Sequence, residues 1–118
     1  MAVNYYNKGY NCGEAIIKSV NKKNDTNIPV SIGSPLGRGM SVGSVCGAVA
    51  AGVVTIGFLK GRNNASEENN ASKHSRDLMN KVKEKFGVET CIELKRKGVS
   101  CNEIVKFVDE YLVDFNNA

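Results

Sequence analysis

Apolar residues recur at helical spacing in three stretches of the chain, and no stretch sustains the alternation typical of a strand. The stripes predict helices over 12–22, 67–86 and 101–115. A shorter helix is expected over 91–97, ended by Gly98. The residues of the three stripes are Ala15, Ile16 and Val20; Ala71, Leu78, Val82 and Phe86; and Ile104, Val105, Val108, Leu112 and Phe115.

The stretch from Ser44 to Lys60 is apolar on every side and rich in glycine and alanine, which predicts a helix in the middle of the fold. The wider segment 41–59 contains no charged residue and is nearly long enough to span a membrane. Its four glycines, two serines and one threonine weaken that interpretation. A buried helix is therefore favoured over a membrane span.

The segment 24–43 contains prolines, glycines and isolated apolar residues without a helical period. It is expected to be a long loop that could lie over a site. Together the patterns predict an all-α fold with a single domain over residues 1–118. We expect a bundle of about five helices around the glycine- and alanine-rich central helix.

With 42% hydrophobic and 24% charged residues, the 118-residue chain has the composition of a soluble globular domain. Its net charge of +4 comes from lysines interleaved with acidic residues, so a nucleic-acid partner is not expected. The first residues lack the basic and apolar segments of a secretory signal, which predicts a cytoplasmic protein. Because permanent disulfides are uncommon in the cytoplasm, the four cysteines are interpreted as reactive or metal-binding thiols.

Three of the four cysteines share one local motif. Cys12, Cys91 and Cys101 each follow an Asn, Thr or Ser and precede a Glu by two positions. This is the pattern of a capping box with cysteine at the first helical position. Cys46 follows Ser44 by two and is expected at the second helical position. Helix N-termini favour the thiolate, so lowered thiol pKa values are expected, opposed in part by the neighbouring glutamates.

Four longer motifs surround these cysteines in the order GYNCGEAI at Cys12, PLGRGMSVGSVCGAVAAG at Cys46, FGVETCIEL at Cys91 and SCNEIV at Cys101. Over nearly the whole chain this layout resembles the redox-active protein family named for its cysteine pattern, C_GCAxxG_C_C. The central motif reads Cys-Gly-Ala with Gly52 after it, so its local order differs from the family's name. The resemblance implies a small helical redox or cofactor-binding protein and indicates no substrate.

Two interpretations of the cysteines are open. In the first, Cys12, Cys46, Cys91 and Cys101 are the catalytic residues of reversible thiol–disulfide chemistry, as in a thiol-based oxidoreductase. The sequence identifies neither the redox partner nor a cofactor, and this chemistry requires no cofactor. Cys91–Cys101 and Cys12–Cys46 are the candidate pairs, provided that their Cα atoms lie within about 7 Å. In the second, the same four residues bind zinc or an iron–sulfur cluster. The spacings of 34, 45 and 10 residues contain no short paired-ligand motif.

Further alternatives concern single residues and partners. The only histidine, His74, could act as a base beside a thiol, but a partly buried, hydrogen-bonded histidine is the commoner case. Arg38 could assist an anionic substrate or a thiolate, with a solvated loop arginine as the commoner case. A purely structural or partner-binding module is a third class of function. The helix over 44–60 could also be partly covered by a second copy in a homodimer.

Overall fold

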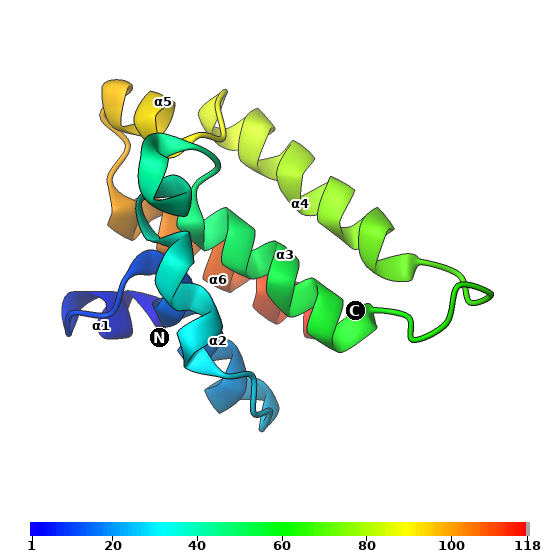
Figure 1. Ribbon diagram of the computed structural model, residues 1–118. Coiled ribbons are helices and arrows are strands. Elements are labelled where there is room, and N and C mark those ends of the chain that lie inside the picture. Colours follow the sequence, from blue (N-terminus) through cyan, green and yellow to red (C-terminus); the bar gives the residue numbers. More distant parts are fainter. Residues whose placement is uncertain (118) are drawn as a thin grey trace.

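The structure, a computed structural model, describes the backbone of residues 1–117 and the side chains of residues 1–113. Over this range the chain forms six α-helices, a 3₁₀-helix (η1) and a short turn with left-handed residues (η2) (Figure 1). The all-α class is confirmed, with more helical elements than the five expected. Their bounds are α1 Ala2–Asn7, α2 Cys12–Asn24, η1 Val30–Leu36, η2 Gly39–Gly43, α3 Gly47–Lys60, α4 Asn70–Phe86, α5 Cys91–Arg96 and α6 Cys101–Asn117.

The apolar stripes of the long helices form the core. The predicted stripe residues of α2 and α6 are buried as far as Leu112, as are Leu78, Val82 and Phe86 of α4, while Ala71 is half-buried. Phe115 lies outside the described side chains. α4 begins three residues later than predicted, because the side chain of Asn69 caps it by accepting a hydrogen bond from the Ser72 N–H.

The segment 24–43 is not the long loop that its composition predicts. η1 covers most of its middle and packs against α2 and α3. The approach to α2 is close, because a Cβ atom at Gly33 would lie only 2.6 Å from the backbone nitrogen of Glu14. A 3₁₀-helix has three residues per turn, so a search for the α-helical period does not reveal it. This segment therefore covers the start of α2.

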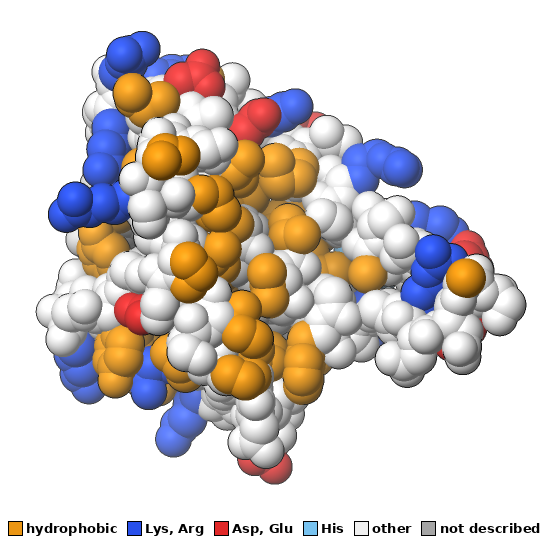
Figure 2. Space-filling model, viewed as in Figure 1, with side chains coloured by type: hydrophobic (Ala, Val, Ile, Leu, Met, Phe, Trp, Pro, Cys, Tyr) orange, Lys and Arg blue, Asp and Glu red, His pale blue; other side chains and the backbone are white. Residues whose placement is uncertain are grey.

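α3 packs against α2, α4 and α6, but one of its sides is uncovered. Phe58 near its end is 55% exposed, and Figure 2 shows hydrophobic side chains gathered in a band over this face of the molecule. The expectation of a central helix buried on all sides is thus not confirmed. Among the helices described, none combines the length and the apolar character that crossing a membrane requires.

A short backbone contact joins the starts of α3 and α5. Val45 and Thr90 form an isolated antiparallel bridge. On either side of it, the Cys46 N–H donates to the Glu89 carbonyl oxygen at 2.9 Å and the Cys91 N–H donates to the Ser44 carbonyl oxygen at 2.7 Å. This contact brings two cysteines together that lie 45 residues apart in the sequence.

A buried carboxylate fixes α1 against α2 and α6. Asp109 on α6 is 6% exposed and accepts hydrogen bonds from the Ser19 hydroxyl at 2.6 Å, the Lys23 amine at 3.1 Å and the Ala2 N–H at 3.2 Å. Burial alone would raise the pKa of Asp109, but these hydrogen bonds and the charge of Lys23 outweigh it and lower the pKa. Since α1 carries Tyr6, this contact also positions one wall of the site described below.

Candidate functional site

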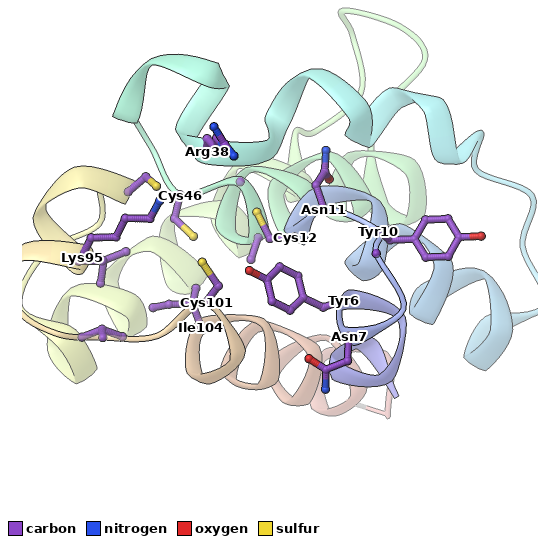
Figure 3. A pocket seen from close by; sticks show the side chains of 16 residues that line it. Tyr6, Asn7, Tyr10, Asn11, Cys12, Arg38, Cys46, Lys95, Cys101 and Ile104 are labelled. Atoms are coloured by element: carbon purple, nitrogen blue, oxygen red, sulfur yellow. The ribbon is translucent and has the colours of Figure 1, made fainter.

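All four cysteines line one cavity of about 570 Å³. In Figure 3 the side chains of Cys12, Cys46 and Cys101 point toward one another from different helices, with Tyr6 reaching in from α1. Cys12 and Cys46 are buried, Cys91 and Cys101 are half-exposed, and all four are free thiols in this structure. Residues that are 34, 45 and 10 positions apart in sequence are thus brought together by the fold.

Capping places three of these cysteines at the first position of a helix, as predicted. Before α2, the Asn11 side chain accepts from the Glu14 N–H at 2.8 Å and the Glu14 carboxylate accepts from the Asn11 N–H at 2.9 Å. The Ser100 box before α6 has the same two hydrogen bonds, at longer distances. Thr90 before α5 accepts from the Glu93 N–H, and its hydroxyl donates to the Glu93 carboxylate.

The predicted position of Cys46 is wrong. Cys46 is itself the N-cap of α3, whose first helical residue is Gly47. Ser44 does not cap this helix, because it lies two residues before the N-cap, and its carbonyl oxygen accepts from the Cys91 N–H in the bridge to α5. The Cys46 side chain therefore occupies the place where an N-cap side chain normally meets the first free N–H groups.

The expected lowering of the thiol pKa is wrong for the two buried cysteines. Burial raises the pKa of Cys46 to about 11, although the N–H groups of Val49 and Ala48 act in the opposite direction. Burial also raises the pKa of Cys12, with the Arg38 N–H opposing it. Desolvation disfavours the charged thiolate more than the helix N-terminus stabilises it. Both thiols are therefore protonated at neutral pH.

Tyr6 is a site residue that the sequence analysis did not single out. A side-chain hydrogen bond with Cys101, together with burial, raises the pKa of Tyr6 to about 12. Its phenol thus stays protonated at neutral pH and can donate to the Cys101 sulfur. Figure 3 shows the Tyr6 hydroxyl directed to the space between Cys101 and Cys12. Nothing in the sequence distinguishes Tyr6 from Tyr5 beside it.

The charged residues of the cavity wall are Arg38 and Lys95. Arg38 adopts a left-handed conformation (φ 57°) between η1 and η2, which a non-glycine residue rarely does. Lys95 lies four residues after Cys91 on α5 and therefore shares its face, a spacing that could have identified it. His74 lies on α4 and does not line the cavity, so it is not placed beside a thiol.

The geometry gives the metal-binding interpretation no support. Among the residues whose side chains are described, no three His, Cys, Asp or Glu side chains are arranged so that they could hold one metal ion. Zinc and iron–sulfur clusters need thiolates converging on a common centre. The four cysteines as they stand share a cavity without forming such a set.

The fold and the cavity define a class of small all-helical proteins that gather four thiols from separate helix starts into one site. The chain belongs to the family described as "Putative redox-active protein (C_GCAxxG_C_C)", whose model matches residues 10–115. The resemblance noted from the cysteine motifs is thereby confirmed. No curated protein and no solved structure matches the chain, so family membership supplies the class of chemistry and no substrate.

Proposed function

We propose that this protein carries out reversible thiol–disulfide exchange with the cysteines of its cavity. The observation that carries the proposal is that four thiols, far apart in the sequence, line one cavity. Membership of a family described as redox-active supports it. A thiol that serves only as a small apolar side chain has no need to share a cavity with three others.

The four thiols differ in exposure, which suggests an order of reaction. Cys12 and Cys46 are each 8% exposed, and burial raises the pKa of both. The half-exposed thiols Cys91 and Cys101 are therefore the candidates for first attack, since thiolate character and access set the rate of exchange. Between these two, Cys101 has the Tyr6 phenol as a side-chain hydrogen-bond partner.

In the proposed reaction the Cys101 thiolate attacks one sulfur of a disulfide R–S–S–R. A mixed disulfide forms, the S–S bond of the substrate breaks, and one RS⁻ leaves and takes up a proton. A second cavity thiol then loses its proton and attacks the Cys101 sulfur, releasing the second RS⁻. Two electrons pass from two protein thiols to the substrate, leaving a protein disulfide and two RSH molecules.

Cys12 is the proposed second thiol of this reaction. Figure 3 shows Cys12 and Cys101 on either side of the Tyr6 hydroxyl. Burial is the largest cause that raises the pKa of Cys12, and the Arg38 N–H opposes it. The charge of Cys101 is the next cause, and it raises the pKa of Cys12 further. Cys46 and Cys91 lie diagonally across the Val45–Thr90 bridge. Diagonal side chains are about 7–8 Å apart, so a second disulfide between them would require this bridge to open. The sequence-based candidates, Cys12–Cys46 and Cys91–Cys101, are tested alongside the Cys12–Cys101 pair.

The test is a thiol count on anaerobically purified, reduced protein before and after treatment with bis(2-hydroxyethyl) disulfide. We expect two or four thiols to be lost and to return with dithiothreitol. Differential alkylation and peptide mapping then identify the oxidised pair, and Cys12→Ser and Cys101→Ser are compared with the unmodified chain. Four thiols that stay free throughout would refute the proposal. Metal and sulfide content, measured on the same sample, would show whether the thiols are occupied by a metal centre instead.

A further inference from the structure

The charge on the cavity wall is of one sign. Sixteen residues line the cavity, and the charged ones among them are Arg38 and Lys95. Both side chains are exposed, whereas Cys12 and Cys46 are buried. Figure 3 shows the two cations on the same side of the cavity as Cys46. The cavity thus has cations at its opening and thiols in its depth.

The glutamates near the cavity are held by helix caps and do not line it. The Glu14 carboxylate accepts hydrogen bonds from the Asn11 N–H at 2.9 Å and from the Ser34 hydroxyl at 2.6 Å. Glu93 and Glu103 are bound in the same way to the caps of α5 and α6. These carboxylates neutralise helix starts. Among the residues whose side chains are described, none with a carboxylate lines the cavity beside the two cations.

The size of the cavity sets the kind of molecule it can enclose. A volume of about 570 Å³ falls within the range of about 300–1,000 Å³ that is typical of small-molecule sites. Its wall also contains the apolar side chains of Leu94 on α5, Ile104 on α6 and Val99 in the link between these helices. A short aliphatic disulfide fits this combination, with its sulfurs near the cysteines and its polar ends at the opening.

We infer that the cavity selects low-molecular-weight disulfides whose two arms carry carboxylates, with Arg38 and Lys95 binding the carboxylates while the disulfide reaches Cys101. This inference rests on the proposed thiol–disulfide function and names its substrate class. The bonds and electrons are those of the exchange described above, with the carboxylate-bearing thiol as the leaving group in both steps. Guanidinium and ammonium groups are suited to this role because they donate charge-assisted hydrogen bonds to carboxylates.

Three disulfides that differ in charge provide the test. Reduced protein is oxidised with 3,3′-dithiodipropionate (two negative charges), bis(2-hydroxyethyl) disulfide (neutral) or cystamine (two positive charges). Each rate is divided by the rate with free dithiothreitol at the same pH, which removes the intrinsic reactivity of the disulfide. Two exposed ion pairs predict a normalised preference of about three- to thirtyfold for the anionic over the neutral disulfide. The preference should shrink at high salt.

Variants assign the preference to the two residues. Arg38→Gln with Lys95→Gln should bring the normalised preference for the anionic over the neutral disulfide close to one. Lys95→Gln alone serves if the double variant folds poorly, and it should lose part of the preference. The matched control is Arg96→Gln with Lys106→Gln, which removes two exposed cations that do not line the cavity and should keep the preference.

The outcomes separate the inference from the function on which it rests. Equal normalised rates for all three disulfides would overturn the inference, and so would an equal loss of the anionic preference in the control variant. Oxidation by the neutral disulfide would still support the proposed function. A protein that none of the three oxidises would overturn the proposed function and the inference with it.

Discussion

The sulfur atom of Cys12 lies against the backbone of Gly47, the first residue of α3. A Cβ atom at position 47 would be 2.6 Å from Cys12 Sγ and 2.4 Å from the Leu36 carbonyl oxygen. Only glycine therefore lets the start of α3 approach Cys12 this closely. Because Cys46 precedes Gly47 directly, the same close approach sets how two buried thiols lie in the cavity.

Replacing this glycine should disturb both stability and chemistry. We expect Gly47→Ala to lower the free energy of unfolding by about 1–3 kcal/mol, since the methyl group must displace neighbouring atoms. Urea unfolding measures this loss, and alkylation kinetics followed by mass spectrometry measure the change at Cys12. The control is Gly57→Ala in the same helix, where an added Cβ meets no atom within 4 Å. It should leave stability unchanged or raise it by up to about 1 kcal/mol, and similar losses in both variants would contradict the packing argument.

The phenol of Tyr6 should affect Cys101 selectively. In Tyr6→Phe the hydroxyl that hydrogen-bonds with Cys101 is missing, so the thiolate loses a donor. We expect alkylation of Cys101 at neutral pH to slow by about three- to tenfold. Tyr5→Phe is the control, because that ring packs edge-on against Tyr10 with centroids 6.3 Å apart. An unchanged alkylation rate in Tyr6→Phe would show that the hydroxyl plays no part.

The buried thiol of Cys46 should make the folded protein sensitive to alkaline pH. Its pKa of about 11 lies above the value of 9.0 for an exposed thiol. Above pH 9 the unfolded chain releases this proton and the folded chain keeps it, so stability falls between pH 9 and pH 11. A difference of two pKa units corresponds to a loss of about 2–3 kcal/mol in the free energy of unfolding. Urea unfolding at several pH values should show a smaller alkaline loss in Cys46→Ala, and parallel curves for the two proteins would refute the assignment.

Asp109 should make the stability of the folded protein sensitive to acid pH. Its folded-state pKa is lowered, so its contribution to stability is present above the ordinary aspartate pKa of about 3.9 and is lost as pH falls through the folded value. Asp109→Asn should cost about 2–4 kcal/mol at neutral pH and speed hydrogen exchange in α1. Glu110→Gln, an exposed neighbour on α6, is the control and should change stability by less than about 0.5 kcal/mol. Equal losses would show that the contact to α1 is not specific.

The features that the sequence predicts well are those with local causes. Three capping boxes identified the starts of α2, α5 and α6 because each uses atoms three residues apart. The start of α3 was misplaced because residues 44–46 pair with residues 89–91 in the bridge to α5, a contact between distant segments that local spacing does not reveal. η1 was missed because its residues follow no α-helical period.

The cavity itself shows a second limit of the sequence. The helix starts that carry the cysteines are local features, whereas their convergence depends on how α2, α3, α5 and α6 pack. The direction of the Cys12 and Cys46 pKa shifts was predicted wrongly for the same reason, because burial is a property of the packed chain. Arg38 was recognised as a candidate, Lys95 could have been identified from its spacing to Cys91, and Tyr6 is recognised as a site residue only from the packed structure.

A pair of cysteines in one short loop keeps its members close even when the chain around it melts. Here the four thiols lie at the starts of four separate helices. One of these, α5, has only six residues and is held by the Val45–Thr90 bridge. Helices this short are not stable alone in water. Local opening of α5 would carry Cys91 and Lys95 out of reach of the other groups together. The site is thus assembled by tertiary structure alone. A partly unfolded chain therefore loses its thiol–disulfide exchange activity instead of reacting with disulfides unselectively.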